Sequence, residues 1–240
     1  MSRAKGIRYG YFAVAVLCFV VFIASGYASN DALQELSGEE REKIIEKFRS
    51  FHKDIRSLSA SVSQEKHLSA LKEKLQVEGT VTMARPDKLR WDTVKPERSH
   101  TVIDGETMTV YHPDIKEAQV YALSEHVIAR NTMGFFTTAM GGALDEMEKK
   151  FSVKIYRNGN EIIYKLQPLS GMTRKYLSAV SISYAEATGL PRGFEVTTPK
   201  GDRTITTLTH ITINPEIKPE TFTMKLPGNV WVTNKFEETR

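Results

Sequence analysis

The sequence predicts a mainly β fold with some helix, in which consecutive antiparallel strands form a meander that curls towards a barrel. Most of the chain consists of short segments rich in β-branched and aromatic residues, and turn signals separate many of them. An amphipathic helix precedes these segments, and a second helical pattern interrupts them. No linker, repeat or low-complexity stretch divides the chain, so we expect one domain.

The first 28 residues have the pattern of a secretory signal peptide. A basic start, an apolar run over residues 11–24, and small residues at Gly26 and Ala28 form its three parts. We expect cleavage after Ala28, which leaves a single domain over residues 29–240. The alternative is an uncleaved membrane anchor, but the apolar run is shorter than the roughly 20 residues that span a bilayer.

Composition excludes several other classes of protein. The only cysteine, Cys18, follows Leu17, whereas a lipidated bacterial cysteine needs a small residue before it. The mature chain therefore has no disulfide, and its stability must come from a hydrophobic core. Removal of the signal takes away three basic residues and no acid, so the net charge falls from +4 to +1. This balance does not favour nucleic-acid binding, and we expect a soluble, exported protein.

An amphipathic helix is expected over residues 38–57. Ser37 and Glu40 have the spacing of a capping box. Apolar residues then recur at intervals that place them on one face of a helix. These residues are Ile44, Ile45, Phe48, Phe51, Ile55 and Leu58.

Strands are expected in most of the remaining chain. Turn dipeptides such as Asp104-Gly105 and Asn158-Gly159 separate several of them. The Lys-rich segment 65–76 is expected to form an exposed hairpin or a short helix, and contact with a membrane surface or a partner is an open alternative for it. The expected strands are Ser61–Gln64, Leu75–Ala84, Ser99–Ile103, Thr107–Tyr111, Gln119–Leu123, Val153–Tyr156, Glu161–Leu166, Leu177–Tyr184, Gly193–Thr198, Thr204–Ile213 and Phe222–Leu226.

A second helical pattern occupies residues 131–151. Apolar residues recur there every three or four positions, and Gly141-Gly142 weakens the helix by roughly 1 kcal/mol per glycine. This indicates two short helices or a hinge. Two interpretations stay open: a helix that fills the core of a curved sheet, or a movable lid over an apolar cavity. The stripe consists of Met133, Phe135, Phe136, Met140, Leu144 and Met147.

The sequence contains no motif for catalysis or metal binding. The six histidines include no pair at metal-ligand spacing. The chain has no HExxH motif, no G-x-S-x-G elbow and no glycine-rich phosphate loop. We therefore expect neither an enzyme nor a protein with a cofactor.

Several features of residues 79–121 occur together in one known family. They are a glycine before a strand, an Arg-Pro pair, an apolar residue two positions before a tryptophan, a later proline, an Asp-Gly turn, and a strand that ends in Tyr and Pro. In this sequence they are Gly79, Arg85-Pro86, Leu89, Trp91, Pro96, Asp104-Gly105 and Tyr111-His112-Pro113. Together with the C-terminal FTMKLPGNVWV, this stretch resembles the outer-membrane lipoprotein carrier family, LolA.

The resemblance implies an incomplete antiparallel β-barrel with a helical lid over an apolar cavity. It implies a monomeric periplasmic chaperone that accepts lipoproteins from an inner-membrane ABC transporter, shields their acyl chains and passes them to an outer-membrane acceptor. Arg85 would latch the lid by donating hydrogen bonds to it. Leu89 matches an apolar residue at the cavity mouth, and Trp91 matches a tryptophan that packs. The expected cavity or lipid-binding residues are Val81, Met83, Leu89, Trp91, Met133, Phe135, Phe136, Met140 and Leu144.

Two departures from better-known members leave alternatives open. The basic connection at 65–76 is longer, and Gly141-Gly142 interrupts the lid stripe. The cargo is therefore either a lipoprotein or another lipid or lipid-linked precursor. A third alternative is a sensor module on the same fold that binds a membrane regulator. The receptor-side relative, LolB, is normally lipidated, which Leu17-Cys18 argues against.

Overall fold

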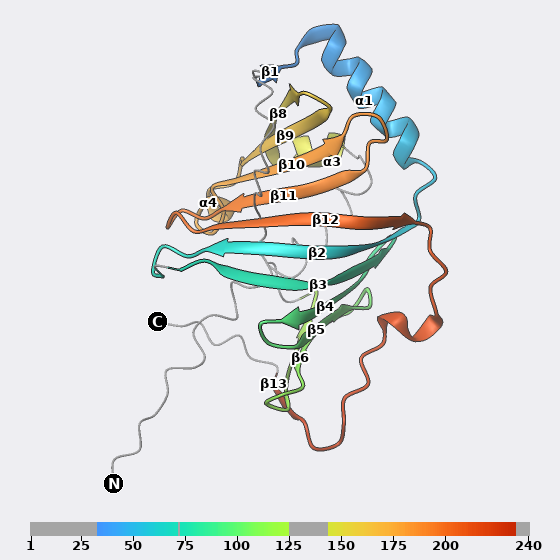
Figure 1. Cartoon of the computed structure of the whole chain (residues 1–240), viewed down its shortest axis with the longest axis vertical. Coiled ribbons are helices and arrows are strands. Elements are labelled where there is room, and N and C mark those ends of the chain that lie inside the picture. Colours follow the sequence, from blue (N-terminus) through green and yellow to red (C-terminus); the bar gives the residue numbers. More distant parts are fainter. Residues whose placement is uncertain (1–32, 72, 125–143, 234–240) are drawn as a thin grey trace.

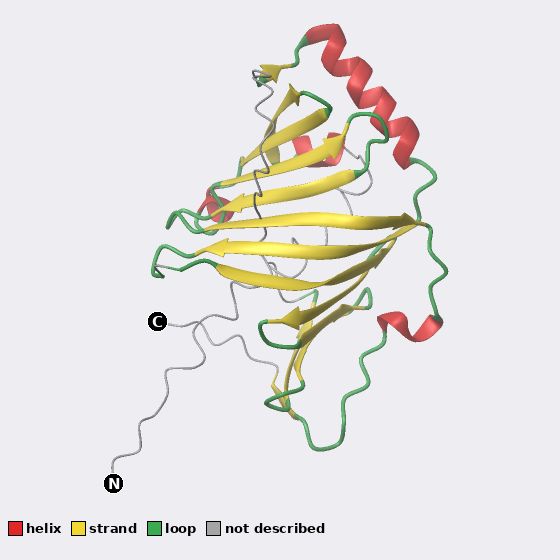
Figure 2. Cartoon of the chain, viewed as in Figure 1, coloured by secondary structure: helices red, strands yellow, loops and turns green. Residues whose placement is uncertain are grey.

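The computed structural model describes residues 33–71, 73–124 and 144–233 of the chain. Strands make up most of these residues and helices are few (Figures 1 and 2), which confirms the predicted mainly β fold. The helices are α1 (Gly38–His52), α3 (Leu144–Glu148), α4 (Gly171–Arg174) and the 3-10 helix η1 (Pro219–Phe222). The strands are β1 (Gln34–Glu35), β2 (Ser57–His67), β3 (Leu75–Ala84), β4 (Lys88–Lys95), β5 (Ser99–Ile103), β6 (Thr107–His112), β7 (Glu117–Ala122), β8 (Phe151–Asn158), β9 (Glu161–Pro168), β10 (Ala179–Ala185), β11 (Pro191–Thr197), β12 (Arg203–Ile213) and β13 (Trp231–Thr233).

The strands form one curled sheet that stays open (Figure 1). The chain builds β2 to β7 as one meander and β8 to β12 as a second, and β12 then pairs with β2 to join the two halves. Neighbouring strands are antiparallel, except that β13 runs parallel to β7. β1 and β13 lie at opposite edges of the sheet, so no pairing among the described residues closes it into a barrel.

The main core lies on one face of this sheet. Strand side chains alternate between two faces, and the apolar side of the strands packs with residues of α1 and α3 in one continuous cluster. We call this side the inner face. Burial of each large apolar side chain contributes about 1.5–3 kcal/mol. Buried members of this cluster include Phe48, Leu58, Val81, Leu89, Ile103, Met108, Leu144, Tyr164, Ile182 and Tyr184.

The C-terminal part of the chain crosses the opposite, outer face of β4 to β7. Phe222 is buried there, and Val102 of β5 and Val120 of β7 line a pocket with it. The guanidinium of Arg90 donates to the carbonyl of Thr221 at 3.3 Å, so a side chain holds this segment. The predicted strand at 222–226 is therefore wrong, because the segment covers the sheet instead of pairing with it.

Helix α1 is shorter than predicted. It ends at His52, and the backbone N–H of Ile55 donates to the carbonyl of His52 as the chain turns towards β2. Leu58 belongs to β2, because apolar residues at 58, 60 and 62 follow the period of a strand. Ser37 is the N-cap residue as predicted, but its side chain makes no capping hydrogen bond, so the capping box is wrong.

The stretch from Met83 to Trp91 is a hairpin. β3 ends at Ala84, one residue before the Arg85-Pro86 pair, and β4 begins at Lys88. The peptide bond between Arg85 and Pro86 is cis. The Lys-rich segment 65–76 also forms a hairpin, between β2 and β3, which is the first of the two predicted alternatives.

Gly79 provides a test of the close approach between β3 and β4. A Cβ at this position would lie 2.2 Å from the carbonyl oxygen of Asp92, which is backbone and cannot move aside. We expect Gly79→Ala to lower the free energy of unfolding by about 1–3 kcal/mol, as overpacking does. Chemical denaturation measures this change. Gly228→Ala is the control, because nothing lies within 4 Å of a Cβ there. Equal stability of the two variants would contradict the close approach.

Candidate functional site

Arg85 lies in the turn between β3 and β4, at one end of the inner face. Its backbone N–H donates to the carbonyl of Arg56 at 2.8 Å, which fixes the turn against the start of β2. The side chain is half-buried. Its Nη2 is fully buried and has no hydrogen-bond partner among the described residues. A buried donor without an acceptor costs about 1–3 kcal/mol, and more when it is charged, so this nitrogen is poised to bind an acceptor that reaches this end of the inner face.

His52 lies close to Arg85 and is fully buried at the end of α1. Its Nε2 lies 2.6 Å from the carbonyl oxygen of Gly189, so Nε2 carries the proton and donates. Its Nδ1 is then an acceptor, with no partner among the described residues. Burial lowers the pKa of His52; the hydrogen bond to Gly189 opposes this, and the charge of Arg85 lowers the pKa further. The same end of the inner face thus holds a buried donor and a buried acceptor.

The lowered pKa of His52 predicts a pH dependence of stability. Above pH 6.5, the ordinary pKa, the unfolded and folded states both keep this histidine neutral. As the pH falls below 6.5, the unfolded state takes up the proton first, so the free energy of unfolding decreases. Carboxylates with lowered pKa values, such as Asp104 and Asp202, lose their contribution only at lower pH.

We expect His52→Gln to show a smaller loss of stability than the wild type between pH 6.5 and 5. Denaturation at several pH values measures it. His112 is also buried with a lowered pKa and contributes in the same range, so His112→Gln serves as a comparison. If the free energy of unfolding of His52→Gln changes with pH as it does in the wild type, the His52 imidazole can be protonated in the folded state without a loss of stability.

Four of the predicted cavity residues lie side by side on the inner face. Val81 pairs with Trp91 across β3 and β4, and Met83 pairs with Leu89. Val81, Met83 and Leu89 are each only 3% exposed, and the partly buried Trp91 packs against the same cluster. Leu89 is therefore inside the wall and not exposed at a mouth in this state.

Part of the predicted lid stripe also reaches the inner face. Leu144 and Met147 are buried and lie on α3, so the end of the stripe is helical. The other predicted members lie outside the described residues and stay predictions, as does a hydrogen bond from Arg85 to the lid. They are Met133, Phe135, Phe136 and Met140.

An aromatic cluster fixes α1 over the other half of the inner face. Phe48 stacks on Tyr164 of β9 with ring centroids 6.1 Å apart, and it meets Tyr184 of β10 at 5.4 Å. Burial raises the pKa of both tyrosines, which keeps them neutral. One half of the open sheet is therefore covered by α1, and the hairpin with Arg85 belongs to the other half.

Sequence reasoning missed His52 as part of the site. The predicted helical stripe passes through Phe51, which is 39% exposed, whereas His52 is fully buried. The spacing could have indicated that His52 is buried, because it lies four residues after Phe48 and seven after Ile45 on the same helical face. The apolar pattern did not include His52, because histidine is a polar residue.

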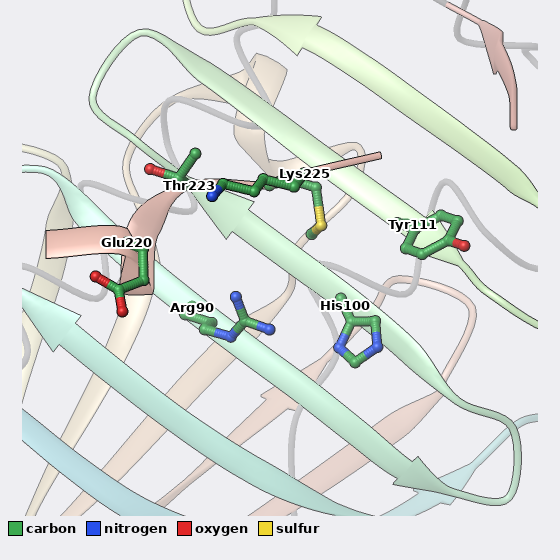
Figure 3. Close-up of a pocket in the computed structure, with 7 residues that line it drawn as sticks. Arg90, His100, Tyr111, Glu220, Thr223 and Lys225 are labelled. Atoms are coloured by element: carbon green, nitrogen blue, oxygen red, sulfur yellow. The ribbon is translucent and has the colours of Figure 1, made fainter. Parts of the chain in front are cut away.

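The outer face carries a pocket of about 330 Å³ (Figure 3). Arg90, His100 and Tyr111 line it together with residues of the C-terminal segment. Arg90 donates to Asp92 at 2.7 Å, and Nδ1 of His100 lies 2.6 Å from the same carboxylate. Asp92 thus holds Arg90 and His100 in place, and Arg90 in turn binds the carbonyl of Thr221. We interpret this cluster as a support for the C-terminal segment.

The inner face of the described residues is apolar and buried. No group of three or more His, Cys, Asp or Glu side chains in the described ranges could hold a metal ion. Among the helices of the same ranges, none is both long and apolar enough to cross a membrane. The arrangement combines a buried apolar inner face with two buried polar atoms, Nη2 of Arg85 and Nδ1 of His52, at one end of it.

The sequence is similar to a known protein family and to several curated proteins. The profile of the family described as "Outer membrane lipoprotein carrier protein LolA" matches residues 53–225. An outer-membrane lipoprotein carrier protein of Vibrio parahaemolyticus is 27% identical over 161 residues, which cover 67% of this chain and 71% of the relative. One of Chromohalobacter salexigens is 23% identical over 152 residues, or 63% of this chain and 68% of the relative.

Solved structures give a weaker likeness. An uncharacterized conserved protein from Thermus thermophilus aligns with a TM-score of 0.49 and 12% identity, over 82% of this chain and all of that one. A LolA superfamily protein from Nitrosomonas europaea aligns with a TM-score of 0.41 and 10% identity, over 76% of this chain and 97% of that one.

Proposed function

Because the chain belongs to the LolA family of outer membrane lipoprotein carrier proteins, we propose that it carries lipoproteins through the periplasm and shields their acyl chains. In this proposal an inner-membrane ABC transporter supplies the cargo and an outer-membrane acceptor receives it. An N-terminal signal cleaved after Ala28 directs export. The mature chain acts as a monomer and carries out no catalysis.

The observation that carries the proposal is the apolar inner face of an open sheet. Val81, Met83 and Leu89 form a continuous wall with Trp91, and the sheet has no closing strand pair that would seal it in the described ranges. Each methylene removed from water contributes about 0.8 kcal/mol. An acyl chain laid along this wall can therefore gain several kcal/mol, provided that the groups now covering the wall move away.

Arg85 supplies the means of control in this proposal. Its buried Nη2 lacks a partner among the described residues, and the predicted lid would provide carbonyl acceptors for it. Cargo must break these bonds to enter, and the bonds form again when cargo leaves. The lid residues Met133, Phe135, Phe136, Met140 and Leu144 would then close over the acyl chain as the second wall.

Mass spectrometry of material that copurifies with the protein from its native host tests the proposal. We expect acylated proteins in amounts comparable to the carrier. Free lipid or a lipid-linked precursor without acylated protein would replace the proposed cargo by another lipid. Absence of any lipid would contradict a carrier function.

The export step has its own test. We expect N-terminal sequencing of the protein from fractionated cells to begin at Ser29, in the soluble periplasmic fraction, because the basic start, apolar run and small residues form a complete signal. A membrane-bound protein that still begins at Met1 or Ser2 would contradict the export prediction.

A further inference from the structure

The end of the sheet opposite Arg85 carries exposed apolar and basic residues that the proposed function does not use. Three connections meet at this end: residues 68–75, which join β2 to β3 and include Leu75 as the first residue of β3, residues 169–178 between β9 and β10, and residues 198–202 between β11 and β12. We call them the hairpin rim. Figure 1 shows the β2–β3 tip, the β11–β12 turn and α4 on the same side of the molecule.

Large apolar side chains stand out into solvent on this rim. Met172 is the most exposed of them, at 68%. They occur on two of the three connections, so the rim presents several separate apolar points and not one flat patch. The others are Tyr176 at 56%, Leu169 at 52%, Leu71 at 40% and Leu75 at 39%.

Basic residues accompany the apolar ones. The three connections hold five lysines and arginines against two acids, Glu73 and Asp202. Lys175 and Lys200 make no ion pair within the described ranges, whereas Lys74 pairs with Glu65 at 2.6 Å. Excess positive charge therefore lies beside the exposed apolar side chains.

Local hydrogen bonds hold the rim in this shape. The backbone N–H and the hydroxyl of Ser69 donate to the carboxylate of Asp202 at 2.6 and 2.7 Å, which ties the β2–β3 tip to the β11–β12 turn. The guanidinium of Arg174 donates to the carbonyl of Leu169 at 3.0 Å. The hydroxyl of Ser170 accepts from the backbone N–H of Met172 and caps α4. Asp202 keeps its negative charge in these bonds, and the five basic residues of the rim still exceed its two acids.

We propose that the hairpin rim docks the protein on an anionic lipid bilayer surface. Separate apolar side chains can enter the boundary between headgroups and acyl chains, while lysines and arginines bind lipid phosphates. A protein partner would be better matched by one continuous apolar patch with a polar border. In this proposal the rim contacts the lipid headgroups of the bilayer surface. This contact is independent of which cargo, if any, occupies the inner face.

Sedimentation with lipid vesicles tests this proposal with the processed chain as expressing cells produce it. The vesicles consist of phosphatidylcholine alone or of phosphatidylcholine mixed with phosphatidylglycerol. We expect binding to the mixed vesicles, weakened by added salt. Binding to neither kind of vesicle would overturn the proposal, even if a protein partner of the rim were found.

Paired variants assign the binding to the rim. Lys175→Glu with Lys200→Glu should weaken binding at least about tenfold, because each basic residue near an anionic surface contributes about a factor of five. Leu71→Ser with Met172→Ser should weaken it comparably. Ile213→Ser is the matched control, because Ile213 is 41% exposed at the far end of β12. Denaturation verifies that each variant is folded. Equal loss in the control, or none in the rim variants, would overturn the assignment.

Discussion

Arg85→Leu should bind cargo about 10- to 100-fold more tightly than the wild type and release it poorly. The leucine cannot donate to the lid, so the closed state that competes with cargo is lost. Charged hydrogen bonds of this kind contribute about 1.5–3 kcal/mol, which corresponds to that range of affinity. The buried, unpartnered Nη2 motivates this prediction. Reconstituted loading and transfer with a purified acylated lipoprotein measures both steps.

Arg56→Leu is the control for this prediction. Arg56 is exposed, and its carbonyl contacts the backbone of Arg85, so the two arginines are neighbours that differ in the burial of their side chains. We expect Arg56→Leu to load and release cargo normally. If Arg85→Leu also behaves like the wild type, the arginine belongs to the turn alone and the latch is wrong.

Met147→Glu should weaken the binding of an acyl chain by at least about 100-fold. Met147 is buried on α3 and packs against the inner face. A carboxylate there has no counter-ion among its apolar neighbours, and burial of an unpaired charge costs several kcal/mol. Titration with a fluorescent fatty acid measures the affinity.

Met147→Leu is the control, because it keeps the volume and the apolar character of the side chain. We expect it to bind the fatty acid like the wild type. Denaturation of both variants separates lost binding from lost folding. A folded Met147→Glu variant with unchanged affinity would mean that the acyl chain lies elsewhere.

Local sequence signals predicted most of the sheet because each hairpin is specified by a few neighbouring residues. At Asp104-Gly105, for example, the Asp104 carboxylate accepts hydrogen bonds from the backbone N–H groups of Glu106 and Thr107, as a turn signal requires. Strand β4 was not among the expected strands, although Leu89, Arg90, Trp91 and Asp92 alternate apolar and polar as a half-buried strand does. Arg90 and Asp92 are the polar members of this alternation. The structure shows that they pair with each other on the outer face, a contact that periodicity alone does not reveal.

The candidate site was predictable where it follows one hairpin and unpredictable where distant elements meet. Met83 and Leu89 face each other because β3 and β4 are adjacent in the sequence. The meeting of His52 with Gly189 depends on α1 packing on a connection 137 residues away. Likewise, the path of the C-terminal segment over the outer face depends on tertiary packing, and a β-rich composition at 222–226 was misleading there.

In the proposed function the inner face contacts the acyl chains of lipoproteins. A photoactivatable phenylalanine analogue at position 91 places a probe on the inner face, and the same analogue at position 111 places one on the outer face beside His100. Irradiation in cells that produce a tagged lipoprotein shows which probe reaches it. We predict crosslinks from position 91 only, which disappear when the acylated cysteine of the lipoprotein is replaced by serine. Equal crosslinking from position 111, or crosslinks from position 91 that persist without the acyl chains, would contradict the claim.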